Sequence, residues 1–408
     1  MDNTLSRTEA DSSPHPAAEG ADVGGADVLE VHVVLLTNFV PPYRLPVFEA
    51  LAERVARLTV LVSTPVESNR AWRPDSGRLD MRVQRTITVP RTWRHPSGFA
   101  DPVPLHFPWD TFAQLRGLRP DVIISAEFGL RSLFSAVYRR RSSRAALVLW
   151  ATLSERTEES RGRARRGLRR WLARRADRVI VNGASGRRYV ERLGMPSARV
   201  DEIPQVALPS FADVASAQAQ GFGIAHLVFV GQLTQRKGLD RFLPSLDEWA
   251  RAHPTRALTL SIAGSGPQAA ALESSPSPPN LEIRLVGEVE PSALPDLYAG
   301  ADALVFPTLA DEWGLVVNEA LAAGVPVLGS IHSQAVVELC DEGATGWLFD
   351  PEDPTSARAA IERALATNDD ELARMRELAR ARVRALTPEW AADRIAATIQ
   401  RALSDVRR

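Results

Sequence analysis

Short apolar runs alternate with amphipathic stretches through most of the chain. The near-continuous apolar character of the runs is typical of strands covered on both faces of a parallel sheet. Amphipathic segments between them, such as residues 45–57, predict helices. In the first half the predicted strands are residues 30–37, 58–63, 83–89, 121–125, 146–150 and 178–182.

The same alternation restarts in the second half. Strand–helix repetition implies right-handed βαβ units and a parallel sheet. We therefore predict an α/β protein of two Rossmann-like, doubly wound domains, residues 28–207 and 224–386, that face a cleft. The second set of predicted strands is 226–231, 258–264, 281–287, 303–307 and 325–330, and the last predicted helices are 354–367, 371–386 and 389–406.

Two segments lack any period. Residues 1–27 are rich in Ala, Gly, Asp, Ser and Pro and predict a disordered tail. Residues 208–223 predict a linker between the domains, since they combine Pro, Ala, Gln and Gly without hydrophobic periodicity.

Composition excludes several classes of protein. The longest apolar runs, such as Ala145–Ala151, are far shorter than the ~18–20 residues of a membrane span. The N-terminus has no apolar core of a signal peptide, so we expect a cytoplasmic protein. The single cysteine, Cys340, rules out an intrachain disulfide and a multi-cysteine metal site. The seven histidines are scattered, and we predict no bound metal and no cofactor.

The formal charge of −1 argues against a nucleic-acid partner, but the charge is unevenly distributed. Residues 1–210 carry 32 arginines against 23 acidic residues, whereas the remainder is acidic. Residues 156–178 hold ten arginines against three acids, and apolar residues recur there at helical spacing, which predicts a basic amphipathic helix. This helix fits two interpretations. It could contact anionic lipid peripherally at the inner face of the membrane, or it could pack an apolar stripe on the core and expose its arginines to solvent.

Candidate ligand-binding residues follow the predicted strands of the second half. Ligands of open α/β sheets bind beyond the carboxyl ends of the strands. The first strand there is followed by Gly231 and then by Arg236 and Lys237. Lys237 is the only lysine among 49 basic residues; a compact ammonium that reaches a phosphate explains its presence, and chance retention is the alternative. The next strand is followed by the turn containing Gly264 and Gly266.

A helix is predicted from Gly314 to Gly324, and its first amides form a site suited to a phosphate. Asp311 precedes this helix and Glu319 lies eight residues further on, about two turns away. Both carboxylates can therefore face one side and hold sugar hydroxyls. An N-capping Asp with a solvated Glu is the alternative.

These motifs resemble a known family. The runs GQLTQRKGLDRFL (231–243), GSGP (264–267) and PTLADEWGLVVNEALAAGVPVLGS (307–330) are similar, in order and spacing, to the C-terminal domain of retaining glycosyltransferases of family 4. The N-terminal runs TNFVPPYRLPVFEALA (37–52) and ADRVIVNGASGRRYVERLG (176–194) match the family's more variable acceptor domain more loosely. The resemblance implies the GT-B fold, a final helix (387–408) that returns to the first domain, and transfer of a hexose-type sugar from a nucleotide-diphosphate donor with retention.

The resemblance also implies residue roles. Arg236 and Lys237 would neutralise the donor diphosphate, and Glu319 would hold the ribose. Asp311 stands where the family usually has glutamate; either Asp311 or the following Glu312 would contact the donor sugar, and the register favours Asp311. The amides of Gly314, Leu315 and Val316 would bind the distal phosphate. The turn after Gly287 would touch the base.

Acceptor residues are expected at strand ends of the first half. Asn38, Tyr43 and Arg44 follow its first strand, and Glu127 follows the strand at 121–125. Helix capping or a surface role is the alternative for each. The acceptor would be a glycan, a lipid-linked compound or a small molecule.

Three rival interpretations remain. A sugar-nucleotide epimerase shares the architecture, but its expected histidine and acid pattern is not evident. A Rossmann oxidoreductase lacks support because no G-x-G-x-x-G opens a helix with an acidic residue ~20 positions on. A catalytically silent nucleotide- or glycan-binding protein stays open because of Asp311.

Overall fold

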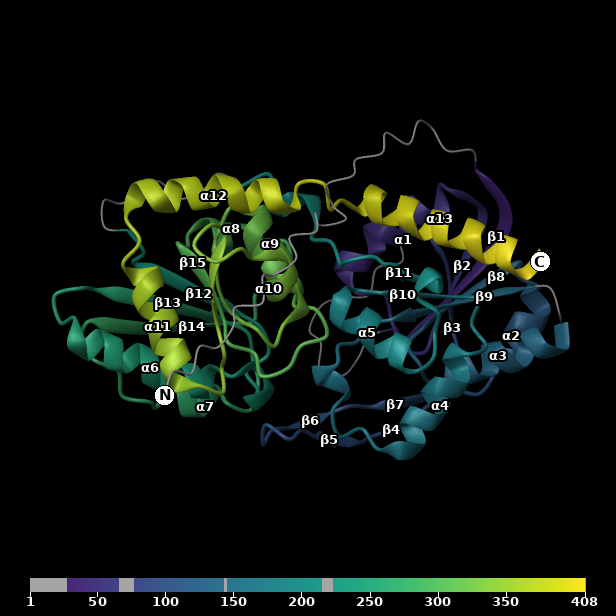
Figure 1. Ribbon diagram of the computed structural model, residues 1–408, viewed down its shortest axis with the longest axis horizontal. Helices are drawn as coiled ribbons and strands as arrows, with labels where there is room; N and C mark the ends of the chain where they lie inside the picture. The colour runs from purple at the N-terminus through teal and green to yellow at the C-terminus, as the bar shows by residue number, and fades with distance from the viewer. Residues whose placement is uncertain (1–27, 66–76, 143–144, 215–222, 408) are drawn as a thin grey trace, which may run out of the picture.

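The computed structural model describes residues 28–65, 77–142, 145–214 and 223–407, which form two parallel sheets side by side, each covered by helices (Figure 1). The predicted tail (1–27) and residues 215–222 of the predicted linker lie outside the described residues. No helix in the described ranges is long and apolar enough to cross a membrane.

The first sheet has seven strands, and every neighbouring pair is parallel. Its order is β11-β10-β9-β8-β1-β2-β3. The strands are β1 (Leu29–Thr37), β2 (Val55–Val62), β3 (Asp80–Val83), β8 (Val122–Ala126), β9 (Ala146–Ala151), β10 (Arg178–Val181) and β11 (Val200–Glu202). The helices around it are α1 (Leu45–Ala52), α2 (Thr111–Leu118), α3 (Leu130–Ser142), α4 (Arg163–Ala173) and α5 (Ala184–Arg192).

The second sheet has six parallel strands in the order β14-β13-β12-β15-β16-β17. The strands are β12 (His226–Val230), β13 (Leu258–Ala263), β14 (Leu281–Gly287), β15 (Ala303–Phe306), β16 (Val327–Ser330) and β17 (Gly346–Phe349). Its helices are α6 (Leu239–Ala252), α7 (Ala269–Glu273), α8 (Leu294–Ala299), α9 (Leu315–Ala322), α10 (Gln334–Leu339), α11 (Pro354–Leu365) and α12 (Asp369–Val383).

Both sheets are doubly wound, which confirms the predicted fold class. In each, the chain starts at a central strand, proceeds outward on one side, and then returns to fill the other side. The direction reverses between β1 and β8 in the first sheet and between β12 and β15 in the second. Such switch points leave a crevice between diverging loops, and ligands bind there. Strands β8, β9 and β15 are wholly buried, as their unbroken apolar runs predicted.

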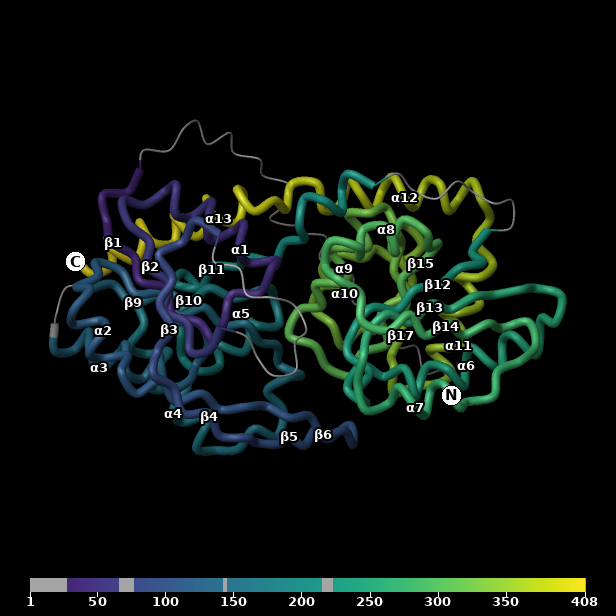
Figure 2. The backbone as a smooth tube through the Cα atoms, turned by 180° about the vertical axis from the view of Figure 1, so that it is seen from behind, coloured from purple at the N-terminus to yellow at the C-terminus, as the bar shows by residue number. Residues whose placement is uncertain are grey.

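Two small antiparallel sheets of two strands each lie between β3 and α2 in the chain. β4 (Thr86–Val89) pairs with β7 (Leu105–Pro108), and β5 (Thr92–Arg94) pairs with β6 (Ala100–Pro102). Figures 1 and 2 show β5 and β6 reaching from the N-terminal half toward the C-terminal half. Trp93 and Phe99 of this hairpin pack against Leu309 and Ala310, which follow β15.

Some predicted boundaries were wrong. The helix predicted over 45–57 ends at Ala52, because Val55 already pairs with Leu29 in the sheet. The strand predicted over 83–89 is two strands of different sheets; the buried Gln84 side chain between them donates to Thr111 Oγ1 at 2.8 Å and fixes the corner.

The basic helix predicted over 156–178 is also shorter. A 3₁₀ turn, Arg156–Glu158, is separated from α4 by Gly162, whose φ of 89° interrupts the helix. Arg178 belongs to β10. The predicted pattern missed β5, β6, β7, β11 and β17, which are short.

The last helix, α13 (Pro388–Arg407), lies along the N-terminal half, while α12 lies along the C-terminal half (Figures 1 and 2). It packs on α1 and β9. Arg54 beside α1 pairs with Asp393 at 2.5 Å. Ile395 and Ile399 are fully buried, so apolar packing anchors α13 to the N-terminal half.

Ile399→Ala is expected to lower the free energy of unfolding by about 2–5 kcal/mol, because it removes buried methylene groups and leaves a cavity. The adjacent Gln400 is exposed, and Gln400→Ala is expected to change stability by less than about 0.5 kcal/mol. Urea denaturation of both variants measures the difference. Equal stabilities would show that α13 does not contribute to the core.

Candidate active site

The predicted cations and acid of the second domain come together at its switch point. Lys237 Nζ lies 2.5 Å from Asp311 Oδ2, and an Arg236 terminal nitrogen lies 3.6 Å from the same oxygen. Arg236 and Lys237 end the loop after β12, and Asp311 lies in the loop after β15. All three side chains are less than one-fifth exposed. The topology therefore concentrates charge in the crevice.

The electrostatics of this cluster are mutual. Burial opposes ionisation of Asp311, yet Lys237 and Arg236 hold the pKa of its carboxyl below the ordinary value. Burial lowers the pKa of Lys237, although Asp311 counteracts the effect. Lys237 and Arg236 thus both stabilise the ionised form of Asp311.

A second carboxylate reaches the cluster from the other half of the molecule. Asp101 on β6 accepts a hydrogen bond from Arg236 Nε at 2.5 Å. The β5–β6 hairpin is held in place by its apolar contact with Leu309 and by Arg241, which donates to the Ser97 carbonyl. Asp101 therefore pairs with the cation that an incoming anion would need.

The loops after β9 and β15 also meet. Ser154 Oγ donates to the Asp311 carbonyl at 3.0 Å, and Arg156 Nε donates to the Leu309 carbonyl at 3.3 Å. Gln334 on α10 donates to the Leu153 carbonyl at 2.9 Å. The carboxyl-end loops of the two sheets thus contact each other directly.

Packing explains two of the predicted ligand-binding glycines. A Cβ at Gly264 would lie 1.9 Å from the Gly231 carbonyl oxygen, and one at Gly266 would lie 2.5 Å from the Leu233 carbonyl oxygen. Glycine is required because these two loops approach backbone to backbone. A Cβ atom at Gly287 would meet no other atom within 4 Å, so packing does not explain this glycine. Donor contact by these glycines stays a prediction.

The first turn of α9 lies next to the charge cluster in the chain. Gly314 has a φ of 107°, and a Cβ there would lie 2.7 Å from the Phe306 ring, so only glycine fits. The helix begins at Leu315, followed by Val316. First-turn amides have no carbonyl partner within a helix, so they can bind an anion.

Glu319 and Asp311 take different partners. Glu319 is buried on α9 and accepts a hydrogen bond from Tyr298 Oη at 3.1 Å. Burial raises the pKa of Glu319 from 4.5 to about 7, and the Tyr298 hydroxyl only partly counteracts this. Its proposed contact with a ribose stays a prediction.

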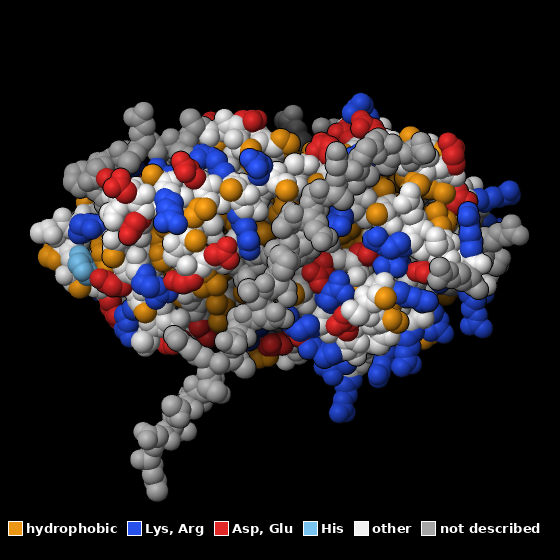
Figure 3. Space-filling view, turned by 45° about the horizontal axis from the view of Figure 1, so that its top comes forward, with side chains coloured by type: hydrophobic (Ala, Val, Ile, Leu, Met, Phe, Trp, Pro, Cys, Tyr) orange, Lys and Arg blue, Asp and Glu red, His pale blue; other side chains and the backbone are white. Residues whose placement is uncertain are grey.

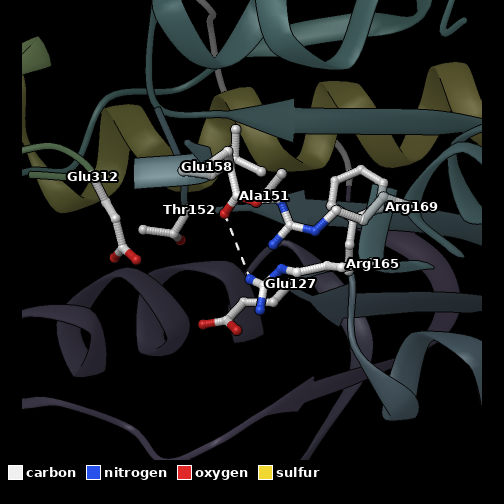
Figure 4. A pocket seen from close by; sticks show the side chains of 9 residues that line it. Glu127, Ala151, Thr152, Glu158, Arg165, Arg169 and Glu312 are labelled. Carbon is white, nitrogen blue, oxygen red and sulfur yellow. Dashed lines mark ion pairs between the residues drawn. The ribbon is translucent and has the colours of Figure 1, made fainter. Parts of the chain in front are cut away.

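Glu127 and Glu312 approach each other from opposite halves. Glu127 follows β8 with a φ of 66°, an uncommon conformation for a residue with a side chain. Glu312 retains solvent exposure in the crevice, but desolvation by its walls raises its pKa to about 7, and Glu127 and Asp311 add to the rise. Both side chains line one pocket (Figure 4).

The other predicted acceptor residues occupy the first switch point. Arg44 donates to Thr152 Oγ1 at 2.9 Å and lies over the Trp150 ring. Asn38 accepts a hydrogen bond from Arg131, and Tyr43 is half-buried. Arg44 therefore contacts the pocket lining through Thr152, whereas Asn38 helps to hold the loop after β1.

The described residues contain one group whose ligand atoms could surround a metal ion, namely His332, Asp350 and Glu352, within 4.8 Å of one another. Glu352 already pairs with Arg156 at 2.5 Å. That ion pair accounts for one of the carboxylates, and the group gives no argument for a metal.

Sequence reasoning missed Asp101 and the pocket arginines Arg165 and Arg169. Asp101 lies 135 residues from its partner Arg236 along the chain. The two arginines fall within the basic segment that was interpreted as a whole. Helical spacing indicates which arginines share a face, but only the packed structure shows where that face points.

The chain belongs to the group 1, or family 4, glycosyltransferases. A family model described as "Glycosyl transferase 4-like domain" matches residues 40–205, and one described as "Glycosyl transferases group 1" matches residues 225–367. Together they span well over half of the chain. The family resemblance of the sequence motifs is thereby confirmed.

Known relatives agree with this class. The chain is 31% identical to glycogen synthase of Mycobacterium tuberculosis over 216 residues, 52% of this chain and 51% of that protein. It is 31% identical to D-inositol 3-phosphate glycosyltransferase of Nocardia farcinica over 220 residues, 49% and 47% of the two chains. The chain thus matches about half the length of these curated relatives.

Solved structures support the GT-B fold. Anabaena HepE, crystallised in complex with UDP, superposes with a TM-score of 0.67 over 90% of this chain and 99% of that chain. The sequence identity is 15%, so this likeness bears on the fold alone.

Glu319→Gln is expected to remove a pH-dependent loss of stability. The folded-state pKa of Glu319 is about 7 against an ordinary 4.5, so the folded state holds the proton more tightly. Its contribution to stability is complete below pH 4.5 and is lost as the pH rises to 7. Between pH 5 and pH 8, the free energy of unfolding of the variant should therefore rise by about 1–3 kcal/mol relative to that of wild type.

Urea unfolding at both pH values measures this gain, with the exposed Glu377→Gln as control. A stability difference between Glu319→Gln and wild type that does not change with pH would contradict the buried-carboxyl assignment.

Proposed function

We propose that the protein is a retaining hexosyltransferase that moves a sugar from a nucleotide-diphosphate donor to an acceptor in the N-terminal half. The observation that carries this proposal is the cluster of Arg236, Lys237 and Asp311 beside the first turn of α9, at the switch point of the second sheet. Family membership and the UDP-bound structural neighbour support a nucleotide-sugar donor.

The chemistry follows from the charges. Breaking the anomeric bond places negative charge on the leaving diphosphate and positive charge on the sugar. Arg236, Lys237 and the amides of Gly314, Leu315 and Val316 would stabilise the leaving group through preorganised electrostatics. Asp311 would then exchange its contact with Lys237 for the sugar hydroxyls, with Glu312 as the alternative carboxylate for this contact. The leaving diphosphate itself can accept the acceptor's proton.

Two binding surfaces favour transfer over the rival activities. An epimerase would need only the donor site, yet the loops after β8 and β9 build a second polar pocket opposite Glu312. A protein that only binds glycans would not need a cation pair at the proposed diphosphate position. The printed names of the relatives differ in acceptor, so they favour no particular one.

Membrane contact is a secondary proposal. Arg163, Arg166 and Arg170 on the outer face of α4 are exposed. Figure 3 shows basic side chains gathered on the N-terminal half of one face of the molecule. Such a surface is suited to anionic lipid headgroups.

Lys237→Ala is expected to weaken donor binding by about 10–100-fold, since a charge-assisted hydrogen bond contributes ~1.5–3 kcal/mol. Calorimetric titration of UDP, GDP, ADP and dTDP sugars into wild type identifies the donor, and the same titration into the variant measures the loss. Arg358→Ala, which removes an exposed cation paired with Glu248, is the control. If wild type bound no nucleotide sugar at millimolar concentration, the proposed function would be wrong.

Asp101→Asn is expected to strengthen binding of the nucleoside diphosphate by about 3–10-fold. The variant keeps an acceptor for Arg236 Nε but removes a negative charge next to the anion site. The matched control is Asp80→Asn, an exposed residue on the far edge strand β3. Weaker binding in Asp101→Asn would mean that the carboxylate acts by orienting Arg236 rather than by competing with the donor.

A further inference from the structure

A short hairpin of the N-terminal half reaches the charge cluster of the C-terminal half. Residues 92–102, which comprise β5, β6 and the turn between them, form this strap. Asp101 of the strap pairs with Arg236 at 2.5 Å, and both side chains are less than one-fifth exposed. The strap therefore occupies a cation that the proposed function assigns to the donor diphosphate.

Further contacts hold the strap against the C-terminal half. Arg241, in the first turn of α6, donates to the carbonyl of Ser97 in the strap turn. Trp93 and Phe99 pack against the loop after β15. In the described sheets β5 and β6 pair with each other and with no other strand. A hairpin of two strands is marginally stable by itself, so side-chain contacts determine where the strap lies.

The strap is also attached to its own half by contacts outside the charge cluster. His95 Nε2 lies 3.1 Å from the Arg156 carbonyl oxygen, and Trp93 Nε1 donates to the Glu159 carbonyl at 3.4 Å. The Arg161 guanidinium lies over the Trp93 ring, 3.7 Å from its centroid. These contacts can persist when those with the C-terminal half break, so the strap can be released at one side.

The four charges of the cluster cancel one another in this arrangement. Arg236 and Lys237 are the two cations. Asp101 and Asp311 are the two carboxylates that pair with them. A donor diphosphate adds negative charge next to both carboxylates, and like charges at such distances repel. Asp311 belongs to the same half as the cations, whereas Asp101 comes from the strap, so Asp101 is the carboxylate that can leave.

We infer that the strap is autoinhibitory: the Asp101 carboxylate takes the place of a donor phosphate on Arg236, and the arriving donor displaces it. This inference rests on the proposed function and adds a regulation of the proposed donor site. Without the donor, the strap links the two halves across the cluster. Donor binding frees Arg236 and releases the strap from the C-terminal half.

The first test follows the strap with one engineered thiol. Ser97 is buried, and the carbonyl that Arg241 holds belongs to its backbone, so Ser97→Cys keeps this contact. The native Cys340 is buried, and burial raises the pKa of its thiol, so it gives a low background. Saturation with the nucleoside diphosphate found in the donor screen is expected to accelerate maleimide labelling of the Ser97→Cys variant about threefold or more, because release exposes this position.

Ser135→Cys is the matched control, since Ser135 is a fully buried serine on α3 in the same half. Its labelling rate is expected to be the same with and without the nucleotide. Equal acceleration in both variants would mean that the nucleotide loosens the whole N-terminal half, which contradicts release of the strap.

The second test breaks an anchor of the strap that lies outside the charge cluster. Arg241→Gln removes the guanidinium that holds the Ser97 carbonyl, and it is expected to strengthen binding of the nucleoside diphosphate about 3–10-fold, because the strap then competes less well for Arg236. Loss of a positive charge would by itself weaken binding of an anion, so the two explanations predict opposite signs. Arg251→Gln, an exposed arginine on the same helix, is the control and is expected to bind as wild type does.

Two results would overturn the inference. One is unchanged or slower labelling of the Ser97→Cys variant in the presence of the nucleotide, and the other is weaker nucleotide binding by Arg241→Gln. Calorimetric binding of the nucleotide by each variant, measured first, shows that the variant is folded and that its donor site is intact. Failure of wild type to bind any nucleotide would instead contradict the proposed function itself.

Discussion

The contact between Lys237 and Asp311 is the interaction on which the rest of the site depends. Burying two charges costs free energy that their attraction alone seldom recovers, so stability gives little reason to retain the pair. It persists because glycine loops bring the ends of β12 and β15 together at the switch point. Arg236 adds a further positive charge, and Asp101 from the other half neutralises part of it. The cluster is thus preorganised for an anion while remaining balanced in its absence.

The repeated winding of the two sheets explains why the crevice has two chemical characters. Each sheet reverses direction next to its first strand, and the loop after β9 of the first sheet contacts the loop after β15 of the second. The second offers cations and helix amides; the first offers Glu127, Thr152 and the inner arginines of α4. A donor and an acceptor held on separate rigid sheets can be brought together by small movements of the loops between them, which also exclude water.

Local patterns were enough to predict the fold class and to single out Arg236, Lys237 and Asp311, which the structure brings together; their contact with a donor stays a prediction. Buried parallel strands such as β8 and β9 are continuous apolar runs in the sequence. The motif that contains Asp311 lies within one short stretch of the chain, so it can be read without knowledge of the fold. Boundaries failed where tertiary contacts override periodicity, as at Val55, which joins the sheet instead of extending a helix. Asp101 could not be predicted, because its meeting with Arg236 depends on a hairpin whose position is set by Trp93 and Phe99 on Leu309.

The same distinction applies to α4. Its sequence shows a strongly basic helix, and charge counting alone suggests a single electrostatic role. Packing separates that charge: one face is exposed, whereas Arg169 is buried against Glu158 and directs its guanidinium into the crevice. A buried arginine costs more than an exposed one, and a structural helix could use leucine there. Glu158 offsets this cost, since it pairs with Arg169 at 2.5 Å and with Arg165 at 3.5 Å, and Glu127 and Glu312 line the same pocket.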